Sequence, residues 1–287
     1  MSCEDELVVR VDNLSFSYGA KRNLCPKTLK SININAHKGQ LIGIMGPNGC
    51  GKTTFMRCIN KVLKPQEGAV YIDGKDIDKL KMMEIAKICA NIPADVPDDF
   101  HLSVEEFVAL GRYPYITGIW WEGEKDERLV REAMAAYQVT HLRDRKLGEL
   151  SSGEKARVLL AKGAVQQPKI LLADEPSAHL DLKFKLQVMQ ALKDLSRQGV
   201  TVITASHDIN LVTKYCDLVI VISAGQILSY GPPAEIINEE IIRQVYDVEV
   251  TIIREGGEVY VIPLRPVDPE RSKDEGPRPC EKGIIAD

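Results

Sequence analysis

The 287-residue sequence predicts an α/β fold built on a mostly parallel β-sheet, and three observations support that fold class. From position 154 onward, apolar runs of strand length alternate with segments of helical periodicity, which is typical of a parallel sheet covered by helices. A Gly-rich segment at 46–53 joins an apolar run to a helical one. The composition, 44% apolar and 27% charged, is that of a folded globular protein.

The first part of the chain predicts antiparallel strands before the parallel pattern begins. Residues 7–12 and 14–18 alternate apolar and polar side chains, as half-buried antiparallel strands do. Residues 40–45 form a denser apolar run, which is expected of a strand buried on both faces, and 52–63 has helical periodicity. Residues 68–74 predict a strand that ends in an Asp-Gly turn.

The middle of the chain, about 95–150, predicts a helical insert. Ser103 and Glu106 form a capping box at the start of one helix, and 125–137 has the periodicity of another. Strands and helices then alternate again. The expected helices span 154–165, 182–197 and 209–215, and the expected strands span 169–173, 200–204 and 218–222.

The folded domain is predicted to span 1–264 and to end in a C-terminal appendage at about 232–264. A short helical stretch follows Pro232-Pro233, and two alternating segments form a hairpin that turns at Gly256-Gly257. Residues 265–287 contain four prolines and many charges, so they bury too little surface to fold and are expected to be a disordered tail.

The composition also restricts the partners and the compartment. The 37 basic and 41 acidic side chains give a net charge of −4, which argues against a nucleic-acid partner. The longest aliphatic run, 218–222, is far shorter than the ~20 residues that cross a bilayer. The N-terminus lacks the features of a secretory signal, and the seven cysteines contain no Cys-x-x-Cys pair. We therefore expect a cytoplasmic protein with reduced thiols, which reaches a membrane only through a partner.

Residues 46–53 read Gly-Pro-Asn-Gly-Cys-Gly-Lys-Thr and match the phosphate-loop pattern between a strand and a helix. In such a loop the backbone N–H groups and the helix N-terminus bind phosphates. We expect Lys52 to reach the β- and γ-phosphates of a nucleotide and the Thr53 hydroxyl to ligate Mg²⁺. The nucleotide-binding residues expected here are Gly46, Pro47, Asn48, Gly49, Cys50, Gly51, Lys52, Thr53 and Thr54.

Two adjacent carboxylates, Asp174 and Glu175, end the apolar strand at 169–173. The carboxyl end of a parallel strand lies at the ligand-binding edge of the sheet, beside a phosphate loop. Asp174 is suited to the Mg²⁺ shell, and Glu175 to orienting or deprotonating the water that attacks the γ-phosphate. A solvated acidic pair is the alternative, but its pairing with the loop favours the catalytic interpretation.

Leu-Ser-Ser-Gly-Glu at 150–154 resembles the signature loop of ABC ATPases. It is also a capping box, whose hydroxyl, N–H groups and helix dipole can face an anion. The resemblance covers roughly residues 7–263 and implies a P-loop NTPase fold with an antiparallel N-terminal β-subdomain and an inserted helical subdomain. It also implies ATP and Mg²⁺ as cofactors and a head-to-tail dimer, in which Ser151 and Gly153 complete the ATP site of the opposing subunit.

Three further segments fit the same family. Ser-Ala-His-Leu-Asp, ending at Asp181, resembles the D-loop, and His207 resembles the switch histidine that contacts the γ-phosphate and links it to Glu175. Tyr18 resembles the aromatic residue that stacks on adenine, with a core tyrosine as the alternative. The resemblance implies that the catalytic residues are Lys52, Glu175 and His207.

The sequence departs from the family pattern at Ala94, where ABC ATPases usually carry a glutamine that ligates Mg²⁺ and signals to the transmembrane partner. Losing one preorganised polar group can cost roughly 10²–10³ in rate, unless Asp95 substitutes for it. The signature also has Ser152 where glycine is usual and Glu154 where glutamine is common.

Segments 109–115, 231–235 and 245–250 are similar to the ATPases of iron-siderophore, haem and cobalamin importers. This likeness implies multi-spanning permease partners, an indirect extracytoplasmic substrate-binding protein, and a peripheral position on the cytoplasmic face of the membrane. Two alternatives are a soluble ABC ATPase of translation or DNA repair and a weakly hydrolysing regulatory or assembly subunit. The first lacks its second phosphate loop or long coiled coil here, whereas Ala94 keeps the second open.

Overall fold

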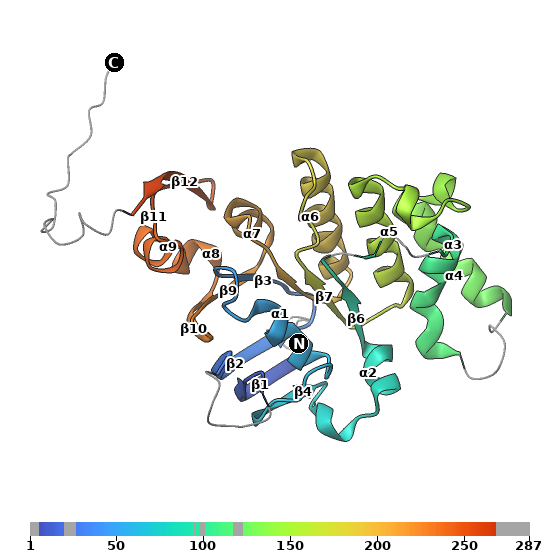
Figure 1. The fold of residues 1–287 in the computed structure, drawn as a ribbon, viewed down its shortest axis with the longest axis horizontal. Coiled ribbons are helices and arrows are strands. Elements are labelled where there is room, and N and C mark those ends of the chain that lie inside the picture. Colours follow the sequence, from blue (N-terminus) through green and yellow to red (C-terminus); the bar gives the residue numbers. More distant parts are fainter. Residues whose placement is uncertain (1–5, 20–26, 95, 98–100, 117–122, 268–287) are drawn as a thin grey trace, which may run out of the picture.

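The computed structural model describes residues 6–19, 27–94, 96–97, 101–116 and 123–267. A six-stranded β-sheet lies at the centre of the fold (Figure 1). Its strand order is β10-β9-β3-β8-β7-β6. The strands are β3 (Leu41–Met45), β6 (Cys89–Ile92), β7 (Ile170–Asp174), β8 (Thr201–Ala205), β9 (Leu218–Ser223) and β10 (Gln226–Gly231). Every neighbouring pair is parallel except β9 with β10, so the predicted mostly parallel sheet is confirmed.

A second, antiparallel sheet has the order β2-β1-β4-β5 and confirms the expected N-terminal β-subdomain. Its strands are β1 (Leu7–Phe16), β2 (Leu29–His37), β4 (Glu67–Ile72) and β5 (Lys75–Asp76). The prediction of two separate strands at 7–12 and 14–18 is wrong. Both segments belong to β1, except for residues 17 and 18, which follow it. The register of β1 shifts around Asn13, where the backbone is left-handed with φ 48°.

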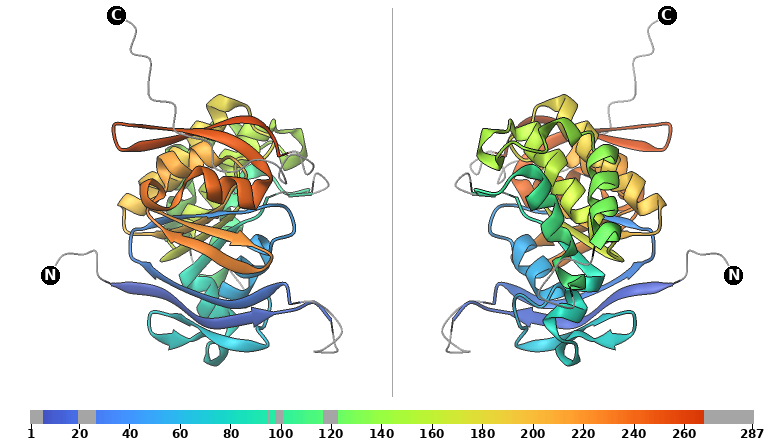
Figure 2. Two further views of the ribbon diagram at one scale, coloured as in Figure 1. Left: turned by 90° about the vertical axis from the view of Figure 1, so that its left-hand side faces the viewer. Right: turned by 90° about the vertical axis from the view of Figure 1, so that its right-hand side faces the viewer.

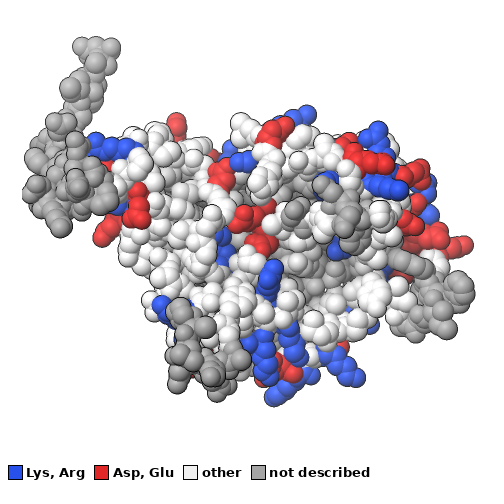
Figure 3. All heavy atoms as spheres, viewed as in Figure 1, with Lys and Arg blue, Asp and Glu red and all other residues white. Residues whose placement is uncertain are grey.

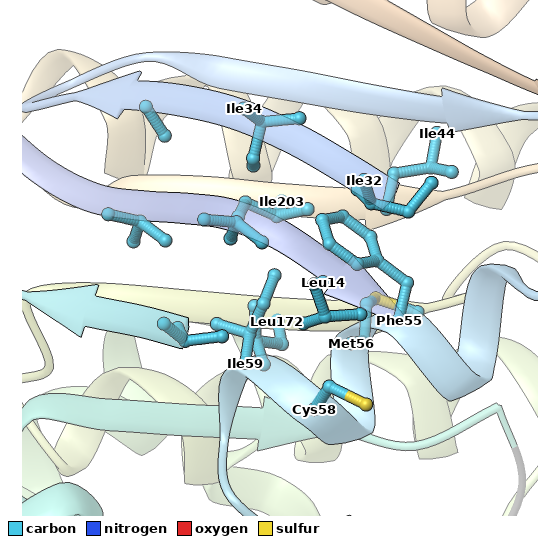
Figure 4. Close-up of a cluster of buried hydrophobic side chains, with 14 of the residues drawn as sticks. Leu14, Ile32, Ile34, Ile44, Phe55, Met56, Cys58, Ile59, Leu172 and Ile203 are labelled. Atoms are coloured by element: carbon cyan, nitrogen blue, oxygen red, sulfur yellow. The ribbon is translucent and has the colours of Figure 1, made fainter. Parts of the chain in front are cut away.

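Helix α1 (Lys52–Ile59) lies between the two sheets. Its Phe55 side chain is fully buried in a cluster that also contains Leu14 of the antiparallel sheet and Ile203 of the central sheet (Figure 4). The helix ends four residues earlier than the expected 52–63, and Lys61 just beyond it adopts a left-handed backbone with φ 61°. The helix that follows the phosphate loop is therefore fixed by both sheets.

Helices α5 (Ser152–Val165), α6 (Leu182–Arg197) and α7 (Ile209–Tyr215) pack on the opposite face of the central sheet. Strand β3 shows both packing faces: Ile42 joins the core around α1, whereas Leu41 and Met45 join the core beneath these helices. Burial on both faces is what the dense apolar run predicts.

The helices of the insert lie beside α5 (Figure 2, right), and a hydrophobic core of their own includes side chains of α5. Its elements are α3 (Val104–Ala109), η2 (Leu110–Tyr115), α4 (Gly123–Ala136), η3 (Thr140–Leu142) and η4 (Leu147–Glu149). The expected capping box forms, because Ser103 accepts from the Glu106 N–H while the Glu106 carboxylate accepts from the Ser103 N–H. Two short helices precede the insert and are missing from the prediction, namely η1 (Ile77–Lys79) and α2 (Met82–Ile88).

A buried ion pair holds the insert together. Arg112 Nε donates to Asp126 Oδ1 at 2.8 Å, and both side chains are almost fully buried, with 4% and 6% of their surface exposed. The guanidinium also donates to the Val165 carbonyl at 3.0 Å and lies 4.0 Å from the ring centroid of Tyr115. The segment 109–115, which resembles siderophore, haem and cobalamin ATPases, thus supplies a structural anchor, and its partner Asp126 was not predicted.

The C-terminal appendage packs beside α7 and the end of the central sheet (Figure 1). It consists of α8 (Pro233–Ile236), α9 (Glu239–Tyr246), β11 (Val248–Glu255) and β12 (Glu258–Pro266). The hairpin turns at Gly256 and Gly257, as expected, but β12 continues to Pro266, two residues past the predicted end of the domain. The rest of the expected tail, 268–287, lies outside the described residues. Within the described ranges, no helix combines the length and apolar character that a membrane span requires.

Candidate functional site

The phosphate loop connects β3 to α1, where the sequence places it. Gly46, Gly49 and Gly51 all have positive φ angles, of 150°, 78° and 111°. A Cβ atom on Gly46 would lie 2.2 Å from the Ile222 carbonyl oxygen, and one on Gly51 would lie 2.7 Å from a Leu29 methyl carbon. Two of the three glycines are therefore required by close packing as well as by backbone conformation.

Lys52 is buried at the start of α1, and its ammonium group points back into the loop. Lys52 Nζ donates to the carbonyl oxygens of Gly46 at 2.9 Å and Pro47 at 3.1 Å. The Cys50 N–H donates to the same Pro47 oxygen at 3.3 Å, and the Cys50 side chain is buried, which raises the pKa of its thiol. The loop also makes a contact that the sequence did not predict. The Gly46 N–H donates to the hydroxyl of Tyr246 at 3.0 Å.

Asp174 lies at the end of β7, where desolvation raises the pKa of its carboxyl group and the nearby Thr53 hydroxyl lowers it in part. Its Oδ1 atom is buried and has no hydrogen-bond partner among the described residues. Mg²⁺ in nucleotide sites takes one or two protein oxygens and completes its shell with phosphates and water. An orphaned carboxylate oxygen beside a hydroxyl therefore fits such an ion.

Glu175 and His207 meet at the ends of the neighbouring strands β7 and β8. His207 Nε2 lies 2.5 Å from Glu175 Oε1, and both side chains remain partly exposed. The Glu175 backbone is left-handed, with φ 49°, and its N–H donates to the Ala205 carbonyl at 3.0 Å. A strained backbone of this kind is often found at functional sites. The structure thus joins the two residues that the family resemblance pairs.

Tyr18 is half exposed, so it is not the core tyrosine that the alternative describes. Its hydroxyl lies 3.1 Å from Thr54 Oγ1 on α1, and its ring meets Phe16 edge-on with centroids 4.9 Å apart. The aromatic ring is therefore placed beside the helix that carries the phosphate loop.

The signature loop and the D-loop segment meet each other rather than the phosphate loop. Ser151 caps α5, and its hydroxyl donates to the Glu154 carboxylate at 2.7 Å, which lowers the pKa of Glu154. A Cβ atom on Gly153 would lie 2.7 Å from the Phe184 ring of α6, and Asp181 caps α6 by accepting from the Phe184 N–H at 3.0 Å. Among the described residues, no hydrogen bond or ion pair joins these residues to the phosphate loop.

Ala94 is exposed at the start of the insert, and its neighbour Asp95 lies outside the described residues. Ala94 lines a cavity of about 200 Å³ between the signature helix α5 and the segment after β7. Other residues of this cavity are Pro93, Ser152, Lys155, Pro176 and His179. Position 94 therefore contacts the same space as the signature helix.

Comparison with known proteins identifies the family. The profile of the ABC transporter family matches residues 29–178. The hemin import ATP-binding protein of Thermobifida fusca is 34% identical over 90% of this chain and 89% of its own. The iron(3+)-hydroxamate import ATP-binding protein of Bacillus subtilis is 31% identical over 78% of this chain and 84% of its own. The chain spans 55% of another Bacillus subtilis relative, an uncharacterized ABC transporter ATP-binding protein that is 36% identical.

Solved structures agree. The Clostridium perfringens cbiO1 protein, part of the ABC transporter complex cbiONQ, superposes with a TM-score of 0.71, at 31% identity, over 84% of this chain and 95% of its own. A dimeric ATP-binding cassette in a post-hydrolysis state, bound to ADP and Pi, gives a TM-score of 0.70 at 28% identity, over 78% of this chain and 98% of its own. The resemblance found in the sequence is confirmed: the chain belongs to the ABC transporter family, whose ATP-binding cassettes bind and hydrolyse ATP.

Proposed function

We propose that the chain is the ATP-hydrolysing subunit of an ABC importer whose substrate is an iron-siderophore, haem or cobalamin-type compound. The names of its relatives support this class, since they include proteins of hemin, iron(3+)-hydroxamate and cobalamin import. The observation that carries hydrolysis at this site is the contact between Glu175 and His207 beside the phosphate loop.

In this proposal the loop 46–54 binds the phosphates of ATP and Tyr18 stacks on the adenine. The Lys52 ammonium exchanges its carbonyl partners for the β- and γ-phosphates. The Thr53 hydroxyl and the Asp174 carboxylate hold Mg²⁺, which neutralises phosphate charge when it is bound. The buried Asp174 Oδ1 without a partner supports this assignment.

Glu175 then orients the attacking water and accepts its proton. His207, held against the Glu175 carboxylate at 2.5 Å, contacts the γ-phosphate and keeps that carboxylate aimed at the water. Because the two side chains already contact each other, little reorganisation is needed when charge develops.

The signature residues act in trans. Ser151, Gly153 and Asp181 lie away from the loop of their own chain, so a second copy arranged head to tail would bring them to it. The dimeric relative bound to ADP and Pi supports the dimer. We further propose that the cassette docks at the cytoplasmic face of the membrane, through the insert near Ala94, on permease subunits served by an extracytoplasmic binding protein. On the face drawn in Figure 3, basic side chains gather along the lower edge, whereas acidic and basic side chains are mixed at the upper right.

Glu175→Gln tests the catalytic assignment. It keeps the shape of the side chain but removes the base, so ATP turnover should be lost while Mg·ATP still drives dimer formation. Glu124→Gln, at an exposed position at the start of α4, is the matched control and should leave both unchanged. Turnover is measured by phosphate release and the dimer by light scattering with ATP. Wild-type hydrolysis by Glu175→Gln would contradict the role of Glu175, and a monomer in saturating ATP would contradict the dimer.

A second candidate, a weakly hydrolysing regulatory or assembly subunit, is favoured by one observation. Ala94 supplies no polar group where the family usually has a glutamine, and it is exposed at the edge of the cavity beside the signature helix. Steady-state hydrolysis by the wild-type chain with its permease separates the two: a rate near background favours this candidate.

A further inference from the structure

The C-terminal appendage touches the phosphate loop through one side chain. Tyr246 is the last residue of α9, and its hydroxyl accepts a hydrogen bond from the Gly46 N–H at 3.0 Å, although the two residues are 200 positions apart. Burial raises the pKa of Tyr246 to about 12. The group therefore stays a neutral hydroxyl under physiological conditions and can accept from an amide.

With this contact, both the carbonyl and the amide of Gly46 are held by hydrogen bonds. On its carbonyl side, Gly46 accepts from Lys52 Nζ at 2.9 Å, and on its amide side it donates to Tyr246. Its φ angle of 150° is one that side-chain-bearing residues rarely adopt, and the Ile222 carbonyl leaves no room for a Cβ atom. A glycine has many accessible backbone states, so its position depends on such external contacts. Within the described part of the chain, Tyr246 and Lys52 are the two side chains shown to hold Gly46 by hydrogen bonds.

The appendage packs against the central sheet and α7, and these contacts hold Tyr246 in place beside the phosphate loop. Val245 of α9 is buried in the same hydrophobic cluster as Val219 and Val221 of β9. Strand β12 is bonded to α7, because the Asn210 side chain both donates to and accepts from the Val261 backbone, at 3.1 and 2.8 Å. Helix α7 begins just after His207. The appendage therefore contacts both the phosphate loop and the helix that follows the switch histidine.

We infer that Tyr246 is a positioning residue for ATP binding. It fixes the Gly46 amide, and with it the first turn of the loop, in the conformation that receives phosphates. The inference rests on the proposed nucleotide site at 46–54. Preorganisation of a loop improves affinity by removing an ordering cost from the binding step. Removing the Tyr246 hydroxyl strands a polar N–H, so ATP affinity should fall by about 3- to 10-fold.

Tyr246→Phe in the full chain is the test, and Tyr230→Phe is its matched control. Tyr230 is also partly buried and donates its hydroxyl to a backbone carbonyl, that of Asn35, but on β10 rather than at the loop. Binding of a fluorescent ATP analogue with Mg²⁺ should weaken about 3- to 10-fold in Tyr246→Phe only. In steady-state hydrolysis by the intact complex, KM should rise while kcat is retained, because chemistry at Glu175 is untouched. Thermal midpoints of both variants show whether either change only loosens the fold.

Three results separate the outcomes. If Tyr246→Phe binds the analogue like wild type, or if Tyr230→Phe weakens binding equally, Tyr246 has no positioning role. The amide resonance of Gly46 gives a readout that needs no nucleotide: it should move in Tyr246→Phe and stay in Tyr230→Phe, and an unmoved resonance overturns the inference. Lys52→Ala reports on the proposed site separately. Wild-type binding by Lys52→Ala would overturn the nucleotide site itself, whereas loss in Lys52→Ala with retention in Tyr246→Phe would overturn the role of Tyr246 alone.

Discussion

Breaking the buried ion pair of the helical insert should destabilise the protein far more than breaking an exposed one. Asp126→Ala leaves the Arg112 guanidinium buried without its carboxylate. Stranding a buried charge typically costs about 3–5 kcal/mol. Arg112 keeps its hydrogen bond to the Val165 carbonyl and its stacking on Tyr115, so we expect the lower end, about 3 kcal/mol. At about 2–4 °C per kcal/mol, the thermal midpoint should fall by roughly 6–12 °C.

Calorimetric unfolding of the purified chain measures this loss, with Glu127→Ala as the matched control. Glu127 pairs with Arg131 one turn away on the same helix at 3.4 Å, but these side chains are 70% and 60% exposed. Exposed pairs of this spacing contribute about 0.3–0.5 kcal/mol, so the control should shift the midpoint by less than about 2 °C.

A double variant tests whether the loss of stability comes from the stranded charge. Replacing Arg112 with Met and Asp126 with Leu removes both charges and leaves an apolar pair, which should cost less than Asp126→Ala alone. If Asp126→Ala is no more damaging than Glu127→Ala, or if the double variant is the worse of the two, the stability does not depend on a compensated buried charge.

Three further predictions concern the site. Ala94→Gln should raise steady-state ATP turnover, by up to ~10², if position 94 lacks a polar group that catalysis uses, and an unchanged rate would contradict this. The raised pKa of Cys50 predicts slow reaction with iodoacetamide at neutral pH, followed by loss of ATP binding; fast labelling, or labelling that leaves affinity unchanged, would contradict it. Ser151→Ala removes the cap of α5 and should cost about 1 kcal/mol in urea unfolding at neutral pH. Because Ser151 lowers the pKa of Glu154, that stabilisation exists above the unfolded pKa and is lost as pH falls through the folded one, so the two proteins should converge on acidification.

Local signals account for the parts of the fold that the sequence predicts. Helix α6 is predicted with its observed bounds because Asp181 caps its start, Gly199 follows its end, and a regular apolar face lies between them. Strand β10 is missed because it alternates apolar and polar residues only weakly and depends on pairing with β9, which no local pattern records. Strand β2 is missed although its local signal is clear, because buried Ile32, Ile34 and Ala36 alternate with exposed polar residues.

The residues of the site likewise divide into those with a local sequence signal and those placed by distant contacts. The phosphate loop, Asp174 and Glu175 are short motifs whose chemistry is written into adjacent residues, and the structure brings them together. Tyr246 could not be found in this way, because its contact with Gly46 depends on how α9 docks 200 residues later. In the proposed dimer, Ser151 and Gly153 would complete the nucleotide site of the other subunit, and such a site cannot be read from the contacts within one chain.

The two hydrogen bonds from Lys52 to carbonyls of its own loop have a consequence for selectivity. Two of the three ammonium N–H groups already donate to these carbonyl oxygens, so a ligand that takes their place must offer the lysine more than they do. A single weak anion gains little by that exchange, whereas a polyphosphate supplies several charged oxygens at once. The carbonyl oxygens of the loop therefore compete with any ligand for Lys52, and this competition favours a polyphosphate over a single weak anion.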